Sequence, residues 1–313
     1  MNWRSKARIQ RAFAALPLIH EPAYYLLQRT FGRLRRPPEP FPMIEAAAEL
    51  VRFLAEAGRK VEGARVMEVG TGRRLDMPIA FFLCGAASVV TFDLHRYLKP
   101  ALVSSSVHMM AQQRDRVAKI LEPVVAPRAV TRRLETLSAA RNTKDLLQRA
   151  GIEYRAPADA GRTGLPAHSV DIQISYTVFE HIPRHVLIEI LREANRILSS
   201  DGVALHHIDP SDHFSHDDNS ILPINFLQYS EAEWSELAGN QFSYHNRLRA
   251  DDYKTLYQES GHEILLWKPY VHAPSVRAIR AAFAIHERFR DYTPEVLGTI
   301  VLQVLSRPAA PRM

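Results

Sequence analysis

The sequence has few of the features of a membrane-spanning, disulfide-bonded or repetitive protein. Its single cysteine, Cys84, excludes a disulfide within the chain, and the apolar run around it favours a buried structural thiol over a nucleophile. No stretch reaches the roughly 18 apolar residues of a membrane-spanning helix. There are no internal repeats or low-complexity tracts. The apolar patch near the N-terminus is short and bracketed by charges, so we expect no signal peptide and a cytoplasmic protein.

The composition is that of a chain with a sizeable core and a basic surface. Hydrophobic residues make up 46% of the 313 residues, and the formal net charge is +6. A basic balance fits nucleic acid, a membrane surface or an anionic substrate, and equally a solvated helix face. We recognise no RNA-binding module and no interleaved aromatic residues, so nucleic acid is not an expected partner. Peripheral membrane contact through the basic N-terminus remains an alternative.

The most informative stretch is a Gly-x-Gly turn after an apolar strand. A second predicted strand, over residues 89–92, follows and ends at Asp93. This spacing is typical of a βαβ nucleotide-binding unit, in which the glycines allow a close approach of the ligand and the acid accepts hydrogen bonds from ribose hydroxyls. The residues of the first strand end and turn are Glu68, Val69, Gly70, Thr71 and Gly72.

The residues around this turn indicate which nucleotide is bound. Arg74 stands where dinucleotide binders usually carry a third glycine, which lets a pyrophosphate sit on the helix N-terminus. Glu68, just before the glycines, suits a ligand with a positively charged amino-acid end. S-adenosylmethionine is such a ligand, with an ammonium, a sulfonium and a ribose but no phosphate. An NAD-dependent oxidoreductase is the alternative, and Arg74 and the lack of a Tyr-x-x-x-Lys pair weaken it.

Further motifs follow in a fixed order along the chain. They are Leu165-Pro166, Ser169-Val170-Asp171, Phe179-Glu180-His181, and a helix-to-strand joint over residues 193–202. Together with the glycine turn and Asp93, they resemble class I S-adenosylmethionine-dependent methyltransferases over about residues 64–210. Arg74 and the joint Ser199-Ser200-Asp201-Gly202, in place of Pro-Gly-Gly, depart from the family pattern.

The resemblance implies an α/β fold with a seven-stranded, mostly parallel, doubly wound sheet and a final antiparallel pair of strands. We expect a helical, basic extension over residues 1–42 and the methyltransferase domain over 43–313. The other expected elements are two helices within 1–40 joined near Leu16-Pro17, a helix over 43–58, a helical insertion over about 95–150 after the second strand (helices from Val103 to Leu121 and from Thr131 to Ala150), a substrate-side loop and helices over about 211–260, and final strands over 262–267 and 296–305.

The resemblance also assigns the cofactor S-adenosylmethionine to residues at the strand ends. Glu68 and the turn from Gly70 to Gly72, including Thr71, hold the methionine end. Asp93 takes the ribose and Leu94 packs on the adenine. Asp159, beside Ala160, accepts from the adenine amino group, although its loop is also ordinary turn chemistry. Tyr176, at the end of a later strand, completes the predicted set.

Methyl transfer to a hydroxyl requires a proton acceptor, and histidine is the usual one near neutral pH. The candidates are His207 or His213, then His181; strand alternation puts Asp209 on the face of His207. The same segment offers Asp209, Asp212, His213 and His216 as divalent-metal ligands. We interpret it as a polar substrate loop and expect no metal.

The expected function is methyl transfer to a small-molecule or glycan-like acceptor, at an oxygen rather than a nitrogen. Arg247 is either a clamp for an anionic group of the acceptor or part of a loop fixed by its neighbours Asn246 and Arg249. The alternative outside enzymes is an inactive scaffold that keeps the fold and docks to a membrane or a partner.

Overall fold

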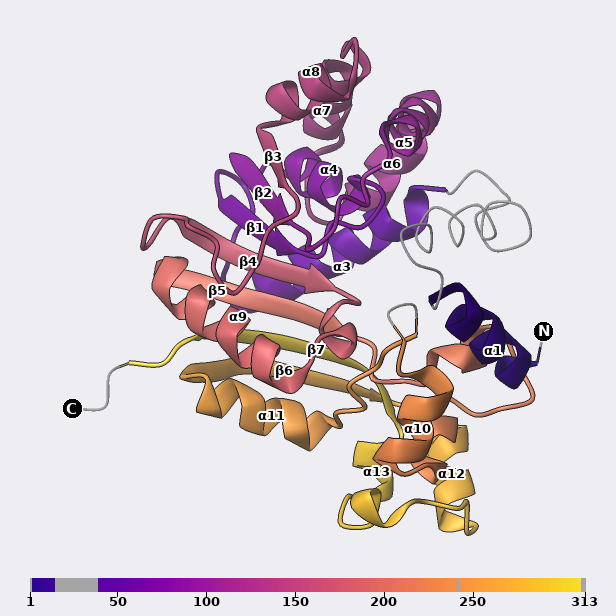
Figure 1. Cartoon of the computed structure of the whole chain (residues 1–313). Coiled ribbons are helices and arrows are strands. Elements are labelled where there is room, and N and C mark those ends of the chain that lie inside the picture. Colours follow the sequence, from indigo (N-terminus) through magenta and orange to yellow (C-terminus); the bar gives the residue numbers. More distant parts are fainter. Residues whose placement is uncertain (1, 15–38, 241–242, 311–313) are drawn as a thin grey trace.

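The computed structural model describes residues 2–14, 39–240 and 243–310. Its centre is a seven-stranded sheet with the order β3-β2-β1-β4-β5-β7-β6 (Figure 1). Strands β1 to β5 are parallel, and β7 is antiparallel to both β5 and β6. The predicted mostly parallel sheet with a final antiparallel pair is therefore confirmed. The strands are β1 (Arg65–Val69), β2 (Ser88–Phe92), β3 (Ile152–Arg155), β4 (Val170–Tyr176), β5 (Leu198–Ile208), β6 (His262–Val271) and β7 (Thr299–Pro308).

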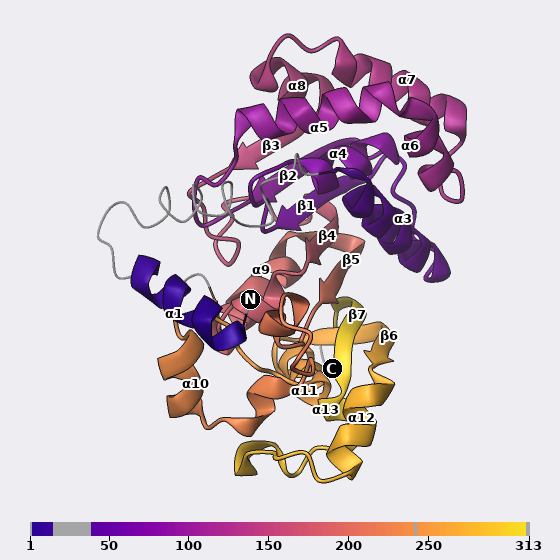
Figure 2. The ribbon, with the colours of Figure 1, turned by 90° about the vertical axis from the view of Figure 1, so that its right-hand side faces the viewer.

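The central strands are apolar because helices cover both faces of the sheet. In β1, Val66 packs into one core layer and Met67 into the other, as the alternation of strand side chains requires. Figures 1 and 2 show α3 and α4, with the insertion, on one face and α9 and α11 on the other. These helices are α3 (Phe41–Glu56), α4 (Asp76–Leu83), α9 (Arg184–Ile197) and α11 (Ala250–Glu259).

The insertion between β2 and β3 is helical, as predicted, but the expected pair of long helices is wrong. The helices break where Gln113 leaves helical geometry, where Pro127 begins a new helix and where the Asn142 side chain accepts the backbone N–H of Asp145. Pro and Asn are typical residues for helix starts, and each break restarts an amphipathic face toward the core. The helices are α5 (Pro100–Gln112), α6 (Arg114–Leu121), α7 (Pro127–Ser138) and α8 (Thr143–Ala150).

A separate aromatic cluster lies beyond the carboxyl ends of the strands. Trp3 of α1 stacks on Trp234 of α10 with ring centroids 6.3 Å apart, and the Trp3 backbone N–H donates to Asp218. Figure 2 shows α1 beside α10, far in sequence but adjacent in space. The elements are α1 (Trp3–Ala14), η3 (His213–His216), η4 (Asn225–Gln228), α10 (Glu231–Ala238), α12 (Ala273–Arg280), η5 (Glu287–Phe289) and α13 (Pro294–Leu297).

Two further expectations concern the chain termini and the membrane. The second helix predicted within residues 1–40, and its joint at Leu16-Pro17, lie outside the described residues. Among the residues that are described, no helix combines the length and the apolar character needed to cross a bilayer.

The last two strands, predicted over 262–267 and 296–305, are confirmed with slightly shifted bounds and are joined through α12 and α13 rather than by a tight turn.

Candidate functional site

The glycine turn after β1 is shaped by its neighbours. Gly70, at φ +89°, donates its backbone N–H to Phe92 at 2.8 Å, and a Cβ on it would lie 2.5 Å from Val178. Only glycine fits there, because both the left-handed φ and the close approach exclude a side chain. Gly72, at φ +68°, has open space where its Cβ would be and donates its N–H to Asp93 Oδ2 at 2.8 Å. The turn and the end of β2 therefore form one hydrogen-bonded unit.

The predicted nucleoside-binding residues lie around this unit. Asp93 accepts backbone N–H groups from Gly72 and His95, and burial raises its pKa above the usual value. Leu94 follows with 61% of its surface exposed, which is unusual for a large apolar side chain and suits a packing surface for a ring. The Asp159 side chain accepts from Gly161 at 2.7 Å, and Ala160 is buried.

Glu68 lies behind the turn and not on its open side. Its carboxyl is 4% exposed and accepts the hydroxyl of Thr91, which also bonds the hydroxyl of Thr71. Burial raises the pKa of Glu68 to about 8, and the charges of Asp93 and Asp76 add to that effect. The group is therefore protonated at neutral pH in this structure, because a buried carboxylate with only a hydroxyl partner is poorly stabilised.

Arg74, the departure from the glycine pattern, does not block the turn. Its guanidinium pairs with Asp76 at 3.0 Å, at the first turn of α4, and also reaches the backbone oxygen of Glu39. The large side chain thus lies along the helix start, away from the space over Gly72. Asp76 is buried, which raises its pKa, and the Arg74 charge opposes that rise.

At the ends of β4 and β5, Tyr176 and His207 stack with ring centroids 4.4 Å apart. Gln303 Nε2 donates to Glu49 at 2.7 Å and lies 3.3 Å from Nδ1 of His207. The bond to Glu49 identifies Nε2 of Gln303 as the amide nitrogen, which donates. Nδ1 of His207 therefore accepts from Gln303, and the hydrogen of the neutral imidazole is on Nε2 of His207. In this tautomer, neutral His207 has no free ring lone pair with which to take a proton from the hydroxyl of a methyl acceptor.

The other catalytic candidates, His181, Asp209 and His213, meet in one cluster with His216 and His245. This histidine cluster comprises two groups of three residues that share His213. Asp209 Oδ2 lies 3.3 Å from His213 Nε2 and 3.5 Å from His216 Nε2. Burial would raise the pKa of Asp209, but hydrogen bonds from His213 and Ser211 outweigh it and bring the pKa to about 2. The carboxylate is therefore charged and turned toward the imidazoles.

His181 is held by the backbone of the segment that precedes α11. Its Nδ1 lies 2.9 Å from the carbonyl oxygen of Tyr244, so Nδ1 donates and Nε2 keeps its lone pair. Surrounding protein atoms and the charge of His213 lower the pKa of His181 to about 4, although part of the ring remains exposed. Glu180, beside it, is 1% exposed, and neither carboxyl oxygen has a hydrogen-bond partner of good geometry.

The neighbouring polar residues hold the segments that carry the cluster. Asp212 turns away from the histidines into the protein, where Asn225 and the N–H of Phe214 donate to it; burial raises its pKa to about 6. Asn246 donates to the carbonyls of Phe179 and Ile182, which ties residues 243–249 to the end of β4.

Arg247 is buried and donates to the carbonyls of Phe226 and Tyr229 and to Glu231. Of the two interpretations of Arg247, these contacts favour the fixed loop over the clamp, because both terminal nitrogens of the guanidinium already donate within the protein. His245, on the same segment, was not singled out from the sequence. It is 7% exposed and enters the cluster from a segment far along the chain.

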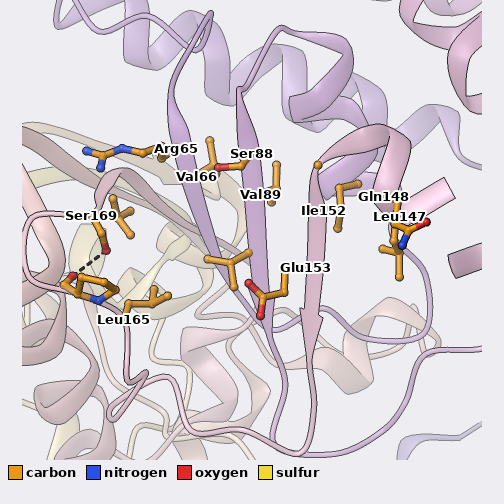
Figure 3. Close-up of a pocket in the computed structure, with 14 residues that line it drawn as sticks. Arg65, Val66, Ser88, Val89, Leu147, Gln148, Ile152, Glu153, Leu165 and Ser169 are labelled. Carbon is orange, nitrogen blue, oxygen red and sulfur yellow. Dashed lines mark hydrogen bonds between the residues drawn. The ribbon is translucent and has the colours of Figure 1, made fainter. Parts of the chain in front are cut away.

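The hollow drawn in Figure 3 lies elsewhere. Its volume is about 320 Å³, and it is lined by Arg65, Ser88 and Ile152, the first residues of β1, β2 and β3. It therefore lies at the edge where the parallel strands begin, opposite to the glycine turn. Ligands of open α/β sheets bind outside the carboxyl ends of strands, so this hollow is not the expected cofactor site.

Comparison with known families finds a match over part of the chain. Residues 128–206 match the family model described as a methyltransferase domain. The matched segment runs from α7 through β5 and excludes the glycine turn and Asp93. With the strand order, this match confirms the predicted resemblance to S-adenosylmethionine-dependent class I methyltransferases. No curated protein sequence matches the chain.

Several solved structures are similar to this one. An S-adenosylmethionine-dependent methyltransferase of Mesorhizobium loti is 17% identical, with a TM-score of 0.40 over 82% of this chain and 96% of that one. Magnesium protoporphyrin IX methyltransferase of Synechocystis is 12% identical, with a TM-score of 0.43 over 85% and 83%. Geranyl diphosphate C-methyltransferase of Streptomyces coelicolor is 9% identical, with a TM-score of 0.44 over 83% and 78%. At such low identities, no function follows from these similarities.

Proposed function

We propose that this chain, which combines a class I methyltransferase fold with a methyltransferase-domain match, transfers a methyl group from S-adenosylmethionine to an oxygen of a small-molecule or glycan-like acceptor. One observation carries the proposal. The glycine turn with Asp93 and the histidine cluster lie at the carboxyl ends of neighbouring parallel strands, where open α/β sheets bind their ligands.

The residues at the ends of β1 and β2 fit this cofactor. The space over Gly72 is open, Asp93 keeps lone pairs for ribose hydroxyls, and Leu94 offers an exposed apolar surface to the adenine. The cofactor supplies a sulfonium methyl group; the acceptor oxygen bonds to the methyl carbon as the C–S bond breaks, and the electron pair stays on sulfur.

The histidine cluster supplies the proton acceptor. His213 is the better candidate of the two favoured histidines, because the Asp209 carboxylate lies 3.3 Å from its Nε2 and can orient the ring for proton transfer. His207 is less suited, since its contact with Gln303 leaves it with a hydrogen on Nε2. In this role His213 takes the acceptor hydroxyl proton as the oxygen attacks, and Asp209 stabilises the imidazolium that forms.

The test is formation of S-adenosylhomocysteine with a panel of hydroxyl-bearing small molecules and glycans, followed by variants. We expect His213→Ala to lower kcat about 100-fold or more, the usual contribution of a general base, with unchanged affinity for S-adenosylhomocysteine. His207→Gln is the matched control and should retain most of the activity. A fully active His213→Ala variant would contradict the assignment of the base.

The cellular setting is a further prediction of this proposal. The lone thiol, Cys84, is buried and unpaired, which is compatible with a reducing cytoplasm. Membrane contact through the basic extension remains a prediction too. Fractionation of cells that produce either the full chain or a chain without residues 1–40 tests the cytoplasmic location and the membrane contact. Only an extension that docks to a membrane would shift the protein to the membrane fraction.

A further inference from the structure

We propose that the histidine cluster binds one divalent transition-metal ion of the Zn²⁺ class, with His213 as the shared ligand. His181, His213 and His245 form one set of potential ligands, and Asp209, His213 and His216 form another. In each set the ligand atoms lie within 4.8 Å of one another. The ligands come from η2 (Phe179–His181) after β4, from the residue after β5, from η3 and from the segment before α11, so the fold brings them together.

The spacing of the second set already matches a coordination sphere. With metal–ligand distances of about 2.1 Å, tetrahedral geometry separates two ligand atoms by about 3.4 Å. Asp209 Oδ2 lies 3.3 Å from His213 Nε2 and 3.5 Å from His216 Nε2. These atoms need little movement to surround an ion. His181 and His245 share His213 with this set, and their ligand atoms lie within 4.8 Å of its ligand atom.

The orientation of His181 is that of a supported ligand. Metal-binding histidines usually donate their second ring nitrogen to a carbonyl or carboxylate, which fixes the tautomer. The Tyr244 carbonyl lies 2.9 Å from Nδ1 of His181, and Nε2 is left with its lone pair. Asn246 joins the two segments by donating to the carbonyls of Phe179 and Ile182. The ring is thus held by one carbonyl, and the backbone on either side of His181 is held by Asn246.

The charges around the cluster favour a cation. Within the described part of the chain, the ion pairs of Asp209 are with His213 and His216 and not with a lysine or arginine. The Glu180 carboxyl is buried nearby, and neither of its oxygens has a hydrogen-bond partner of good geometry. The positive charge of Arg249 acts against binding of a cation, but its guanidinium donates to the carbonyls of Pro210 and Arg247.

The donor set selects the class of metal. Imidazole nitrogens with one carboxylate suit Zn²⁺, Co²⁺ and related ions, whereas Mg²⁺ and Ca²⁺ prefer oxygen ligands. With the ion bound, His213 would be a ligand, and the ion would activate the acceptor hydroxyl by lowering its pKa; His213 would serve as the proton acceptor described above only in the metal-free protein. This consequence rests on the proposed function, but metal binding itself does not.

The test is titration of the EDTA-treated, full-length protein with Zn²⁺, and with Co²⁺ for its visible absorption. We expect one ion per chain and the absorption of a four-coordinate Co²⁺ site. His213→Ala should weaken binding by at least about 100-fold, more than loss of an outer-shell partner costs. His185→Ala, at an exposed histidine of the first turn of α9, is the matched control and should bind like the wild type.

Three outcomes would overturn the inference: no Zn²⁺ or Co²⁺ binding by the folded wild type, binding that His213→Ala leaves unchanged, or preferential binding of Mg²⁺. Thermal unfolding of each variant in EDTA shows whether it is folded. S-adenosylhomocysteine titrations with and without EDTA separate the two proposals. Intact cofactor binding without metal binding overturns only this inference, whereas loss of cofactor binding in the metal-loaded protein contradicts the proposed function.

Discussion

Replacing Glu68 with glutamine should stabilise the protein increasingly as the pH rises. The pKa of Glu68 is raised from 4.5 to about 8 by burial, so the folded state keeps a proton that the unfolded chain loses above pH 4.5. The stability that such a group contributes is fully present below its pKa in the unfolded state, and it is lost as the pH rises to its pKa in the folded state. Each pH unit in that window costs about 1.4 kcal/mol, so two units cost about 3 kcal/mol.

Glutamine does not titrate, and its amide oxygen can still accept the hydroxyl of Thr91. Denaturant unfolding of wild type and Glu68→Gln at pH 5, 6 and 7 measures the difference, which should grow in favour of the variant by about 3 kcal/mol. Glu56→Gln, at an exposed position of α3, should show no such trend. A constant difference for Glu68→Gln would refute the reasoning, because it would mean that Glu68 is ionised and reaches solvent or a ligand.

Three other substitutions test the account of the fold. Gly70→Ala should destabilise the protein by more than about 2 kcal/mol in denaturant unfolding, whereas Gly58→Ala, with a similar φ of +71° and open space, should cost about 1 kcal/mol; equal losses would contradict the close contact with Val178. Arg247→Met should cost about 3 kcal/mol, since it leaves buried carbonyls unpaired, and Glu231→Gln, at the exposed end of the pair, should cost less. The pKa of Asp171 is lowered to about 2 by Arg65, so its contribution to the free energy of unfolding is present above pH 3.8 and lost as pH falls toward 2. Asp171→Ala should remove this part of the pH dependence of stability in acid. An unchanged pH dependence in the variant would refute the reasoning.

The central sheet could be predicted because its strands carry local signals. The strands before the glycine turn and before Asp93 are short apolar runs bounded by turn residues. The insertion was harder, because periodicity continues across breaks. Gln113 is an ordinary helix residue, and its departure from helical geometry depends on tertiary packing of the helices on either side.

The site was predictable where residues follow a strand and less so where they meet from distant segments. Asp93, His181 and Asp209 follow strands, so their common edge follows from the parallel sheet. His245 lies in a loop whose path depends on the contacts of Asn246, and no local pattern marks it. The pairing of Arg74 with Asp76 likewise appears only once the first turn of α4 is formed.

The most direct test of the central claim is calorimetric titration of S-adenosylhomocysteine into wild type, Asp93→Ala and Asp171→Ala. We expect wild-type binding with a Kd on the order of micromolar, weakened about 100-fold by Asp93→Ala, since hydrogen bonds to a charged acceptor contribute about 1.5–3 kcal/mol each. Asp171→Ala, which removes an acid hydrogen-bonded to Arg65 at the opposite edge of the sheet, should retain wild-type affinity. Absence of binding to folded wild type, or equal affinity in Asp93→Ala, would contradict the account.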